Sequence, residues 1–420
     1  MYQIKNLPNG MRTVGERIPH FRSAALGVFV GVGSVHEGEN EHGLSHLIEH
    51  MVFKGTKKRT ARQLAGVMDA VGGNLNAYTS KECTCYYVRV VDEHIPLAVD
   101  VLHDLVAEAL FDENALELEK QVVVEEIAMV EDTPEDLCAE LLNEAFYGTH
   151  SLARPILGRA EQIKSYTRAD VLAYFEKHYH PGNFVFSHAG NYDETRLAAL
   201  LQDTFLGDAP QADPYKGLAF AHGGTQQALV RKKNIEQLHL SLAFQGFQRL
   251  DDRLYPMLVL NTILGGGMSS RLFQRIREER GLVYSVYSYP ASYTGSGMFS
   301  IYAGLNPANA GTVLAIIAEE LDSLRQGRIG EEEFTRAREQ LKGSYVLGLD
   351  GLSSRMSDMG RGLLMNGLIR TEEEVLGKIA AVTPEAVVDV ARQVFAGNAL
   401  AASAVGKMPP RKNMEKLLLG

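Results

Sequence analysis

Hydrophobic and polar positions along the chain predict blocks of strand and helix, and similar blocks occur twice. Apolar runs at Ser23–Val32 and His239–Gln245 predict buried strands, while Ala98–Leu110 and Gly311–Arg325 follow the helical period. Each of these helices is followed by a short break and an acid-rich helix start. The order of elements therefore predicts two halves of similar structure.

A second pair of segments supports this duplication at an offset of 216 residues, from 167 to 383. TRADVLAYFEKHYHPGNFVFSHAG at 167–190 aligns with TPEAVVDVARQVFAGNALAASAVG at 383–406. Both copies predict a helix opened by a threonine cap, a Gly-Asn turn and an apolar strand. The join falls in Gly207–Gly224, which is rich in Gly, Pro, Ala and Asp. We expect domains at residues 1–208 and 224–420, connected by a linker at 209–223.

Strands and helices mix within each half without strict alternation. Asn74–Val91 predicts a long strand or a hairpin, and two consecutive helices follow it. This order favours an α+β fold made of two homologous α/β domains in tandem. Each domain is expected to be a largely antiparallel sheet with helices packed on one face.

The segment HGLSHLIEHMVFKGT at 42–56 carries the strongest chemical signal. Good helix formers run from Ser45 to Lys54, and Gly55 is placed to end the helix. His46 and His50 are four residues apart, so they share a helix face, as two imidazole ligands of one zinc ion must. Glu49 borders this face and can reach a water at the metal as a general base. The alternative is a half-buried helix with two histidines by chance.

An acidic helix supplies candidates for the third ligand that an open catalytic zinc site needs. Residues 112–131 read DENALELEKQVVVEEIAMVE, with Asp112 as a helix cap and Thr133-Pro134 as the stop. Glu119 and Glu126 are seven residues apart and share a face, whereas Glu125 points about 100° away from Glu126. A solvated acidic face is the alternative for all three carboxylates.

The combination of these two segments resembles the family of pitrilysin, insulysin and mitochondrial processing peptidase. HLIEH is followed by Glu126 at a distance of 76 residues from His50, and the resemblance covers nearly the whole chain. It is closest to the short two-domain bacterial members. The resemblance implies a zinc-dependent endopeptidase with one zinc ion per chain on His46, His50 and Glu126. It also implies Glu49 as the general base and Glu119 as a supporting acid.

The same resemblance gives a role to a strand-like segment, GGNLNAYTSKECTCYYVRV at 72–90. It resembles the family's substrate-binding edge strand, to which an extended peptide adds through unpaired backbone groups. Asn76, Ala77 and Tyr78 would be the contact positions. Without the resemblance, an ordinary strand is the better interpretation.

A segment of the second half, SRLFQRIREERGLVYSVYS at 270–288, resembles the family's Arg/Tyr pair that faces the zinc site. The pair falls on Arg277 and Tyr284, whose cation and phenol O–H would stabilise the oxyanion formed on the scissile carbonyl. The alternative for Arg277 is a surface charge beside Arg275 and Arg280.

The run Leu264-Gly-Gly-Gly-Met268 resembles a shortened form of the glycine-rich loop in the non-catalytic subunit of mitochondrial processing peptidase. A phosphate-binding loop is excluded because G-x-x-x-x-G-K-[ST] is absent. The second half contains no second H-x-x-E-H.

The amino-acid composition indicates which partners and which cellular compartment to expect. The 420 residues are 45% hydrophobic and 22% charged, as in ordinary soluble proteins, and the net charge of -10 argues against nucleic acid and anionic membranes as partners. Cys83, Cys85 and Cys138 suggest no disulfide framework and favour a reducing compartment. Since no signal peptide or transmembrane segment is evident, we expect a cytoplasmic protein.

The resemblance also implies partners. Two-domain members of the family close as homodimers around a chamber that admits peptides. A non-catalytic structural or assembly subunit of the same family is the main rival, but such subunits have lost parts of the zinc motif, which is whole here. A metal-dependent hydrolase with another substrate is a second rival, and the peptide-binding strand argues against it.

Overall fold

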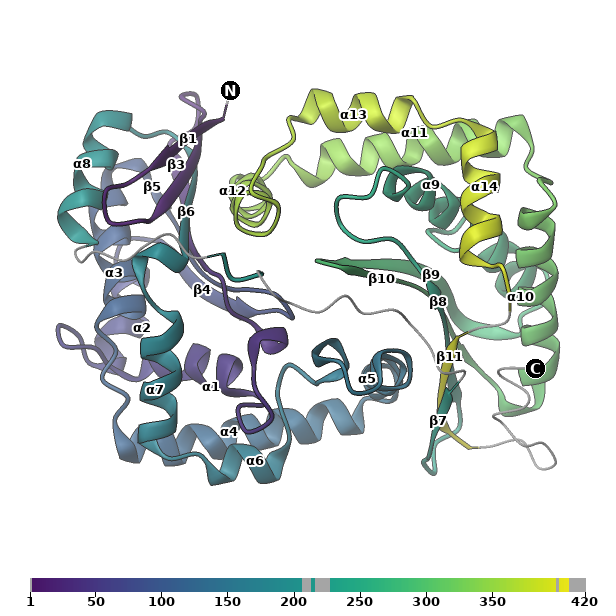
Figure 1. Ribbon diagram of the computed structural model, residues 1–420, viewed down its shortest axis with the longest axis horizontal. Helices are drawn as coiled ribbons and strands as arrows, with labels where there is room; N and C mark the ends of the chain where they lie inside the picture. The colour runs from purple at the N-terminus through teal and green to yellow at the C-terminus, as the bar shows by residue number, and fades with distance from the viewer. Residues whose placement is uncertain (1, 206–212, 216–226, 398–399, 408–420) are drawn as a thin grey trace. The chain divides into compact units, whose positions relative to one another are not determined.

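The computed structural model describes residues 2–205, 213–215, 227–397 and 400–407, which form two compact units with one β-sheet each (Figure 1). The first unit combines Met1–Ala128, Arg154–Gly217 and Gly348–Thr371. The second combines Met129–Ala153, Leu218–Leu347 and Glu372–Gly420. Apart from residues 213–215, the expected linker at 209–223 lies outside the described residues.

The two sheets have the same construction. In spatial order, the first contains β1 (Gln3–Asn6), β2 (Arg12–Arg17), β6 (Phe184–Gly190), β3 (Ser23–Val30), β5 (Thr84–Val91) and β4 (Asn74–Thr79). The second contains β7 (Gln227–Lys232), β11 (Ala401–Gly406), β8 (Leu238–Gln245), β10 (Ser296–Leu305) and β9 (Val283–Tyr293). All neighbours are antiparallel except β2 with β6 and β11 with β7. Without β1, the two orders correspond strand by strand.

Two glycines at equivalent positions of the two sheets have the same backbone conformation, as the duplication predicts. Gly190 ends β6 and Gly406 ends β11, and both have φ of +127°, a conformation that favours glycine. A Cβ on Gly190 would lie 2.3 Å from the Ser23 carbonyl oxygen, and a Cβ on Gly406 would lie 2.3 Å from that of Gln237. The helices before these strands open with Thr167 and Thr383 as side-chain caps, as the repeat predicts. The α+β fold with two similar domains is confirmed.

Helices cover both sheets. Those of the first unit are α1 (Leu44–Met51), α2 (Ala61–Asp69), α3 (Ile95–Ala107), α4 (Glu113–Asp132, which runs on past the unit's last residue), α6 (Ala160–Ser165), α7 (Arg168–His178), α8 (Glu194–Thr204) and α12 (Leu352–Arg361). Those of the second are α5 (Pro134–Tyr147), α9 (Leu254–Leu264), α10 (Ala310–Arg325), α11 (Glu331–Gly348), α13 (Glu372–Ala380) and α14 (Pro384–Val394). Alternate residues of β3, such as Leu26 and Val28, enter the core shared with α1 and α3.

Each sheet also packs against one helix from the other half of the sequence. On the first sheet, α12 lies against β2, β3 and β6, where the Ser187 hydroxyl donates to the Met356 carbonyl. A Cβ on Gly360 of this helix would lie 2.2 Å from the Phe29 ring, so the helix needs glycine there to approach β3.

On the second sheet, α5 buries Leu137, Cys138 and Leu141 against Val405. The compact units therefore differ from the domains expected at 1–208 and 224–420. The reason is that α5 and α12 bury their apolar faces on the sheet of the opposite half.

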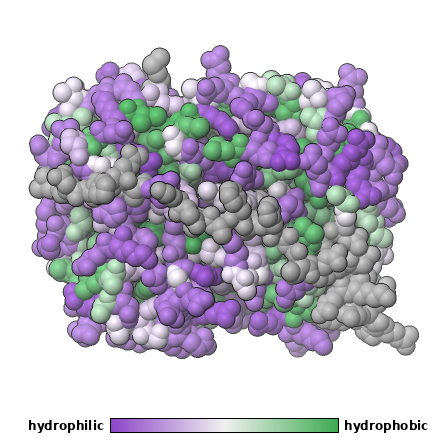
Figure 2. Space-filling model, in the orientation of Figure 1, coloured by the Kyte–Doolittle hydropathy of each residue, from purple (hydrophilic) through white to green (hydrophobic). Residues whose placement is uncertain are grey.

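The surface is mixed in character. Hydrophilic and hydrophobic residues are interspersed on the face shown in Figure 2. No helix in the described ranges is long and apolar enough to cross a membrane. Cys83, Cys85 and Cys138 are all buried free thiols.

Candidate metal centre

The helix α1 is anchored by its apolar face. Leu44, Leu47, Ile48 and Met51 are at most 2% exposed and belong to the core of the first unit. Because these positions fix the rotation of the helix about its axis, His46 and His50 point to the opposite side. Their ring centroids are 4.6 Å apart, one helical turn along the same face, as the spacing predicts.

The N-terminus of α1 is held by a buried carboxylate from outside the helix. Glu37 is 3% exposed, and its two oxygens accept hydrogen bonds from the backbone N–H groups of Gly43 at 2.9 Å and Ser45 at 3.0 Å. These bonds satisfy donors that have no partner within the helix, and a negative charge suits this end of the helix dipole. Burial nevertheless raises the pKa of Glu37 to about 7.

Glu126 reaches the two histidines from α4. Its Oε2 lies 3.6 Å from His46 Nε2 and 3.5 Å from His50 Nε2. All three candidate ligand atoms lie within 4.8 Å of one another. Glu125, the neighbouring carboxylate, is exposed and is not part of this cluster. The helix-face argument that favoured Glu126 over Glu125 thus agrees with the geometry.

These distances fit a tetrahedral zinc ion. Zinc holds His nitrogen and carboxylate oxygen at about 2.0–2.1 Å, so two ligands of a tetrahedral site lie about 3.3–3.4 Å apart. The separations of 3.5 and 3.6 Å from Glu126 to the two imidazoles are close to that edge length. Two imidazoles and one carboxylate form a three-ligand set that leaves a fourth position for water or substrate. The residues present therefore fit zinc.

A carboxylate behind the histidines fixes the tautomer of His50. Glu119, with a side chain 8% exposed, has Oε2 3.1 Å from His50 Nδ1, which donates its proton and leaves Nε2 free as a ligand. The other oxygen of Glu119 lies 2.7 Å from Lys54 Nζ. The supporting position expected for Glu119 agrees with this contact, and Lys54 holds the carboxylate from its far side.

The pKa shifts of His46 and Glu49 suit the roles of metal ligand and general base. Burial and the neighbouring His50 lower the pKa of His46 to about 3, so its imidazole is neutral and available to a metal at neutral pH. Burial raises the pKa of Glu49, while a hydrogen bond from the Thr79 hydroxyl to Glu49 Oε2 opposes that shift. A half-buried carboxylate with a raised pKa beside a metal site is a good candidate for a general base.

The expected peptide-binding residues lie on β4, the last strand of the first sheet. Asn76, Ala77 and Tyr78 pair with β5 on one side only. The N–H of Ala77 donates to the Asn76 side-chain oxygen at 2.8 Å, so a side chain occupies the donor that an added strand would use. An edge strand of this kind can accept an extended peptide.

The corresponding edge strand of the second unit, β9, is covered in part. The Ser288 N–H donates to the Gly265 carbonyl at 3.2 Å, and a Cβ on Gly265 would lie 2.4 Å from the Ser288 nitrogen. Gly265 of the glycine-rich run therefore lies against β9 because it has no side chain there. Only the first unit offers both a metal cluster and an open edge strand among the described residues.

Arg277 and Tyr284 come together in the second unit. Arg277 lies on a π-helix, Phe273–Glu278, and its guanidinium is 4.7 Å from the Phe273 ring and 5.8 Å from the Tyr284 ring. Its neighbour Arg275 pairs with Glu319 and Glu320. Within the described ranges no acid pairs with Arg277. Arg277 is therefore an exposed cation without an acidic partner among the described residues, and it lies beside Tyr284, which is 73% exposed.

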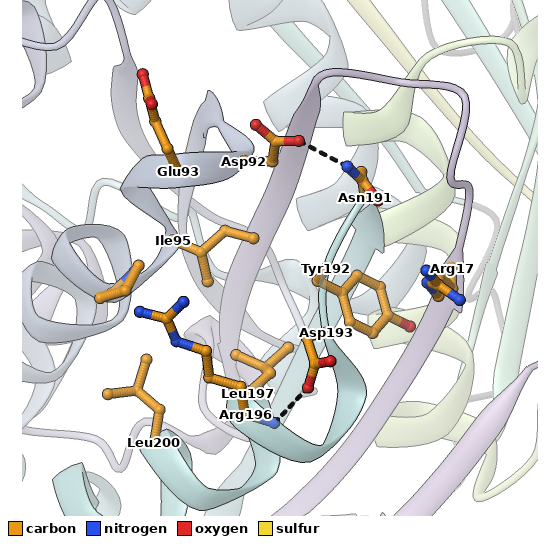
Figure 3. Close-up of a pocket in the computed structure, with 11 residues that line it drawn as sticks. Arg17, Asp92, Glu93, Ile95, Asn191, Tyr192, Asp193, Arg196, Leu197 and Leu200 are labelled. Carbon is orange, nitrogen blue, oxygen red and sulfur yellow. Dashed lines mark hydrogen bonds between the residues drawn. The ribbon is translucent and has the colours of Figure 1, made fainter.

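A cavity of about 360 Å³ lies elsewhere in the first unit (Figure 3). Its lining mixes Arg17 and Arg196 with Asp92 and Asp193. Figure 3 shows Asp92 bonded to Asn191, and Asp193 bonded to the backbone N–H of Arg196 as a helix cap. None of the residues expected at the site lines it, and its charges do not favour one ligand class.

Sequence reasoning missed three residues around the metal cluster. Lys54 follows His46 and His50 at the same spacing of four, so its position on that face was a usable signal. The contact of Thr79 with Glu49 and that of Glu37 with α1 join segments 30 and 6–8 residues apart through the tertiary fold. No local pattern predicts either contact.

Two family models match successive parts of the chain. Residues 12–160 match the family model described as Insulinase (Peptidase family M16). Residues 165–341 match the model described as Peptidase M16 inactive domain. The metal cluster lies wholly within the first match.

Several bacterial proteins resemble the chain over nearly its whole length. A Bacillus subtilis protein described as an uncharacterized zinc protease is 43% identical over 92% of this chain and 94% of its own. A Mycobacterium tuberculosis protein with the same description is 42% identical over 93% of this chain and 90% of its own. Among solved structures, a protease from Helicobacter pylori matches with a TM-score of 0.89 at 20% identity, covering 97% of this chain and 99% of its own. At this identity, the structural similarity shows the fold alone.

The geometry predicts which acid holds the metal. Glu126→Ala should weaken zinc binding by at least about 100-fold, because a ligand is lost rather than a supporting contact, whose loss costs about 10- to 100-fold. Glu125→Ala is the matched control and should bind zinc as the wild type does. Competition with a chromophoric chelator measures both. If Glu125→Ala loses zinc and Glu126→Ala keeps it, the assignment of the third ligand is wrong.

Proposed function

Because the chain belongs to the M16 peptidase family, we propose that it is a zinc-dependent endopeptidase. Its substrates would be peptides or unfolded polypeptide segments that bind in extended form. The observation that carries this proposal is the convergence of His46, His50 and Glu126 at distances suited to zinc, with Glu49 on the same helix.

Each residue of the first unit has a distinct task under this proposal. When bound, zinc lowers the pKa of a water molecule and polarises the peptide carbonyl. Glu49 accepts the proton of the attacking water and later delivers it to the leaving amine. Glu119 orients His50 through Nδ1, and Lys54 holds Glu119.

Substrate binding would use β4. A peptide that adds to the open edge as a further strand exchanges backbone hydrogen bonds with it, and these do not depend on side-chain identity. Its carbonyl would replace the Asn76 oxygen as the acceptor for the Ala77 N–H. Backbone recognition of this kind favours extended chains and gives modest sequence specificity.

Arg277 and Tyr284 would stabilise the oxyanion of the tetrahedral intermediate. The support is that the guanidinium is free of acidic partners among the described residues and lies beside an exposed phenol. A cation already neutralised by a carboxylate, as Arg275 is, would be a poor candidate.

The rival function is a non-catalytic subunit of the same family. The family model described as an inactive domain matches residues 165–341, whereas the metal cluster falls in the segment that matches the insulinase model. A chain with all three ligands and a base retained favours catalysis over a structural role.

The base assignment is tested by Glu49→Gln. The amide cannot accept the proton of water, so peptide hydrolysis should fall by about 10²–10⁴-fold while zinc content stays at one per chain. Quenched peptides and elemental analysis give the two readouts, and a stably folded domain that contains the same cleavage sequence should resist the wild type. Wild-type protein that carries zinc and cleaves no peptide would support the non-catalytic rival.

We also propose that two copies assemble and that each supplies Arg277 and Tyr284 to the partner's metal centre. The basis is the resemblance to two-domain family members. His50→Ala and Arg277→Ala should each be nearly inactive alone. A purified mixed dimer contains one site with all its residues intact, so about half of the wild-type activity should return. A mixed dimer as inactive as both parents would contradict this arrangement and leave the zinc assignment standing.

A further inference from the structure

The last residue of the open edge strand touches the general base. Thr79 ends β4, and its hydroxyl donates to Glu49 Oε2, which lies on α1. The strand proposed to bind the peptide and the helix proposed to bind zinc are thus joined by the hydrogen bond of the Thr79 side chain, and the Thr79 backbone contributes a second, lesser hydrogen bond to Glu49. Asn76, Ala77 and Tyr78 precede Thr79 directly in the same strand.

We propose that Thr79 is a positioning residue that fixes the Glu49 carboxylate and ties it to the strand on which the substrate binds. The inference rests on the proposed peptidase function and goes beyond it, since Thr79 neither binds the metal nor takes part in proton transfer.

The Thr79 hydroxyl has one strong hydrogen-bond acceptor, the Glu49 carboxylate. A threonine hydroxyl has a single proton to donate. The neighbouring Thr84 hydroxyl is fully buried and gives its proton to the Val32 carbonyl at 2.9 Å, so it cannot donate to Thr79. Thr84 Oγ1 lies 3.4 Å from Thr79 Oγ1, which is too far to compete with the much shorter contact to Glu49. The Thr79 proton is therefore committed to the carboxylate.

The position of Thr79 is fixed from the other side by a tight turn. The N–H and the hydroxyl of Ser80 both donate to the Cys83 carbonyl at 2.8 Å, and the Cys83 N–H donates back to Ser80 Oγ at 3.0 Å. Thr79 also pairs with Thr84 in the β4–β5 ladder. A β-branched side chain on such a backbone has little rotamer freedom, so it is a rigid donor.

This contact has a consequence for the reaction. A glutamate side chain has three rotatable bonds, and holding it in place before the substrate arrives removes an entropic cost from the chemical step. A carboxylate accepts about four hydrogen bonds, so the bond from Thr79 leaves room for the proton of the attacking water. The base is then positioned relative to the substrate strand as well as to α1.

Three variants test the inference. Thr79→Val keeps the shape and removes the donor, Thr79→Ser keeps the donor, and Thr84→Val removes the adjacent hydroxyl that does not touch Glu49. Thr79→Val should lower kcat by about 10- to 100-fold, with KM within about two-fold and zinc content unchanged, because only the position of the base is lost. Thr79→Ser should restore kcat to within a few-fold of the wild type.

The matched variants separate positioning from simple packing. Thr84→Val should keep kcat and KM within about two-fold of the wild type, because the bond from Thr79 to Glu49 remains. Should Thr79→Val fold poorly, Thr79→Ala gives the same comparison. Wild-type kcat in Thr79→Val, or an equal loss of kcat in Thr79→Ser, would overturn the inference.

The failure of the proposed function can be told apart from the failure of this inference. The wild type is assayed first, and zinc-loaded wild type without peptidase activity refutes the function alone. In that case crystal structures of the zinc-loaded wild type and Thr79→Val decide. The Glu49 side chain should leave its wild-type rotamer in the variant, and an unchanged rotamer would refute the positioning role.

Discussion

The contact of the two α1 histidines with the carboxylates of α4 is the interaction on which the rest of the site depends. Leu44, Leu47, Ile48 and Met51 fix the rotation of α1 through the core, and His46 and His50 are therefore presented to Glu126 of α4. Two histidines a turn apart occur on many helices, but a carboxylate oxygen 3.5–3.6 Å from both Nε2 atoms requires a second helix at a defined distance. Glu37 at the N-terminus of α1 and the hydrogen bond from Thr79 to Glu49 restrict the same helix further.

Duplication explains why the chain has two similar sheets but one metal cluster among the described residues. Both sheets keep the same strand order, and Gly190 and Gly406 keep the same unusual φ. The edge strands have diverged: β4 is open, whereas the Ser288 N–H of β9 donates to the Gly265 carbonyl at the end of α9. The first copy carries the candidate metal cluster, and the second carries Arg277 on a π-helix whose neighbour Arg275 is anchored by Glu319 and Glu320. Such π-helical segments are frequent at functional sites.

Local patterns predicted the features that depend on helix and strand periodicity. The face shared by His46 and His50, and that shared by Glu119 and Glu126, follow from 3.6 residues per turn. The repeat at an offset of 216 predicted the corresponding helices and strands. Helix and strand periodicity does not reveal tertiary contacts between separate segments, so these could not be predicted from the sequence. They are the contacts of Glu37 with α1 and of Thr79 with Glu49, and the packing of α5 and α12 on the sheets of the opposite halves. An apolar helix face shows that it will be buried but does not identify the sheet that buries it.

The proposed function requires a zinc ion held by two imidazoles and one carboxylate. X-ray absorption at the zinc edge of the purified protein measures this coordination directly. The spectrum should show two histidine nitrogens and oxygen ligands at about 2.0–2.1 Å, with no sulfur at about 2.3 Å. The absence of sulfur is expected because Cys83, Cys85 and Cys138 are buried and none of them belongs to the cluster. A sulfur shell, or a signal from fewer than two imidazoles, would contradict the assignment of the metal centre to His46, His50 and Glu126.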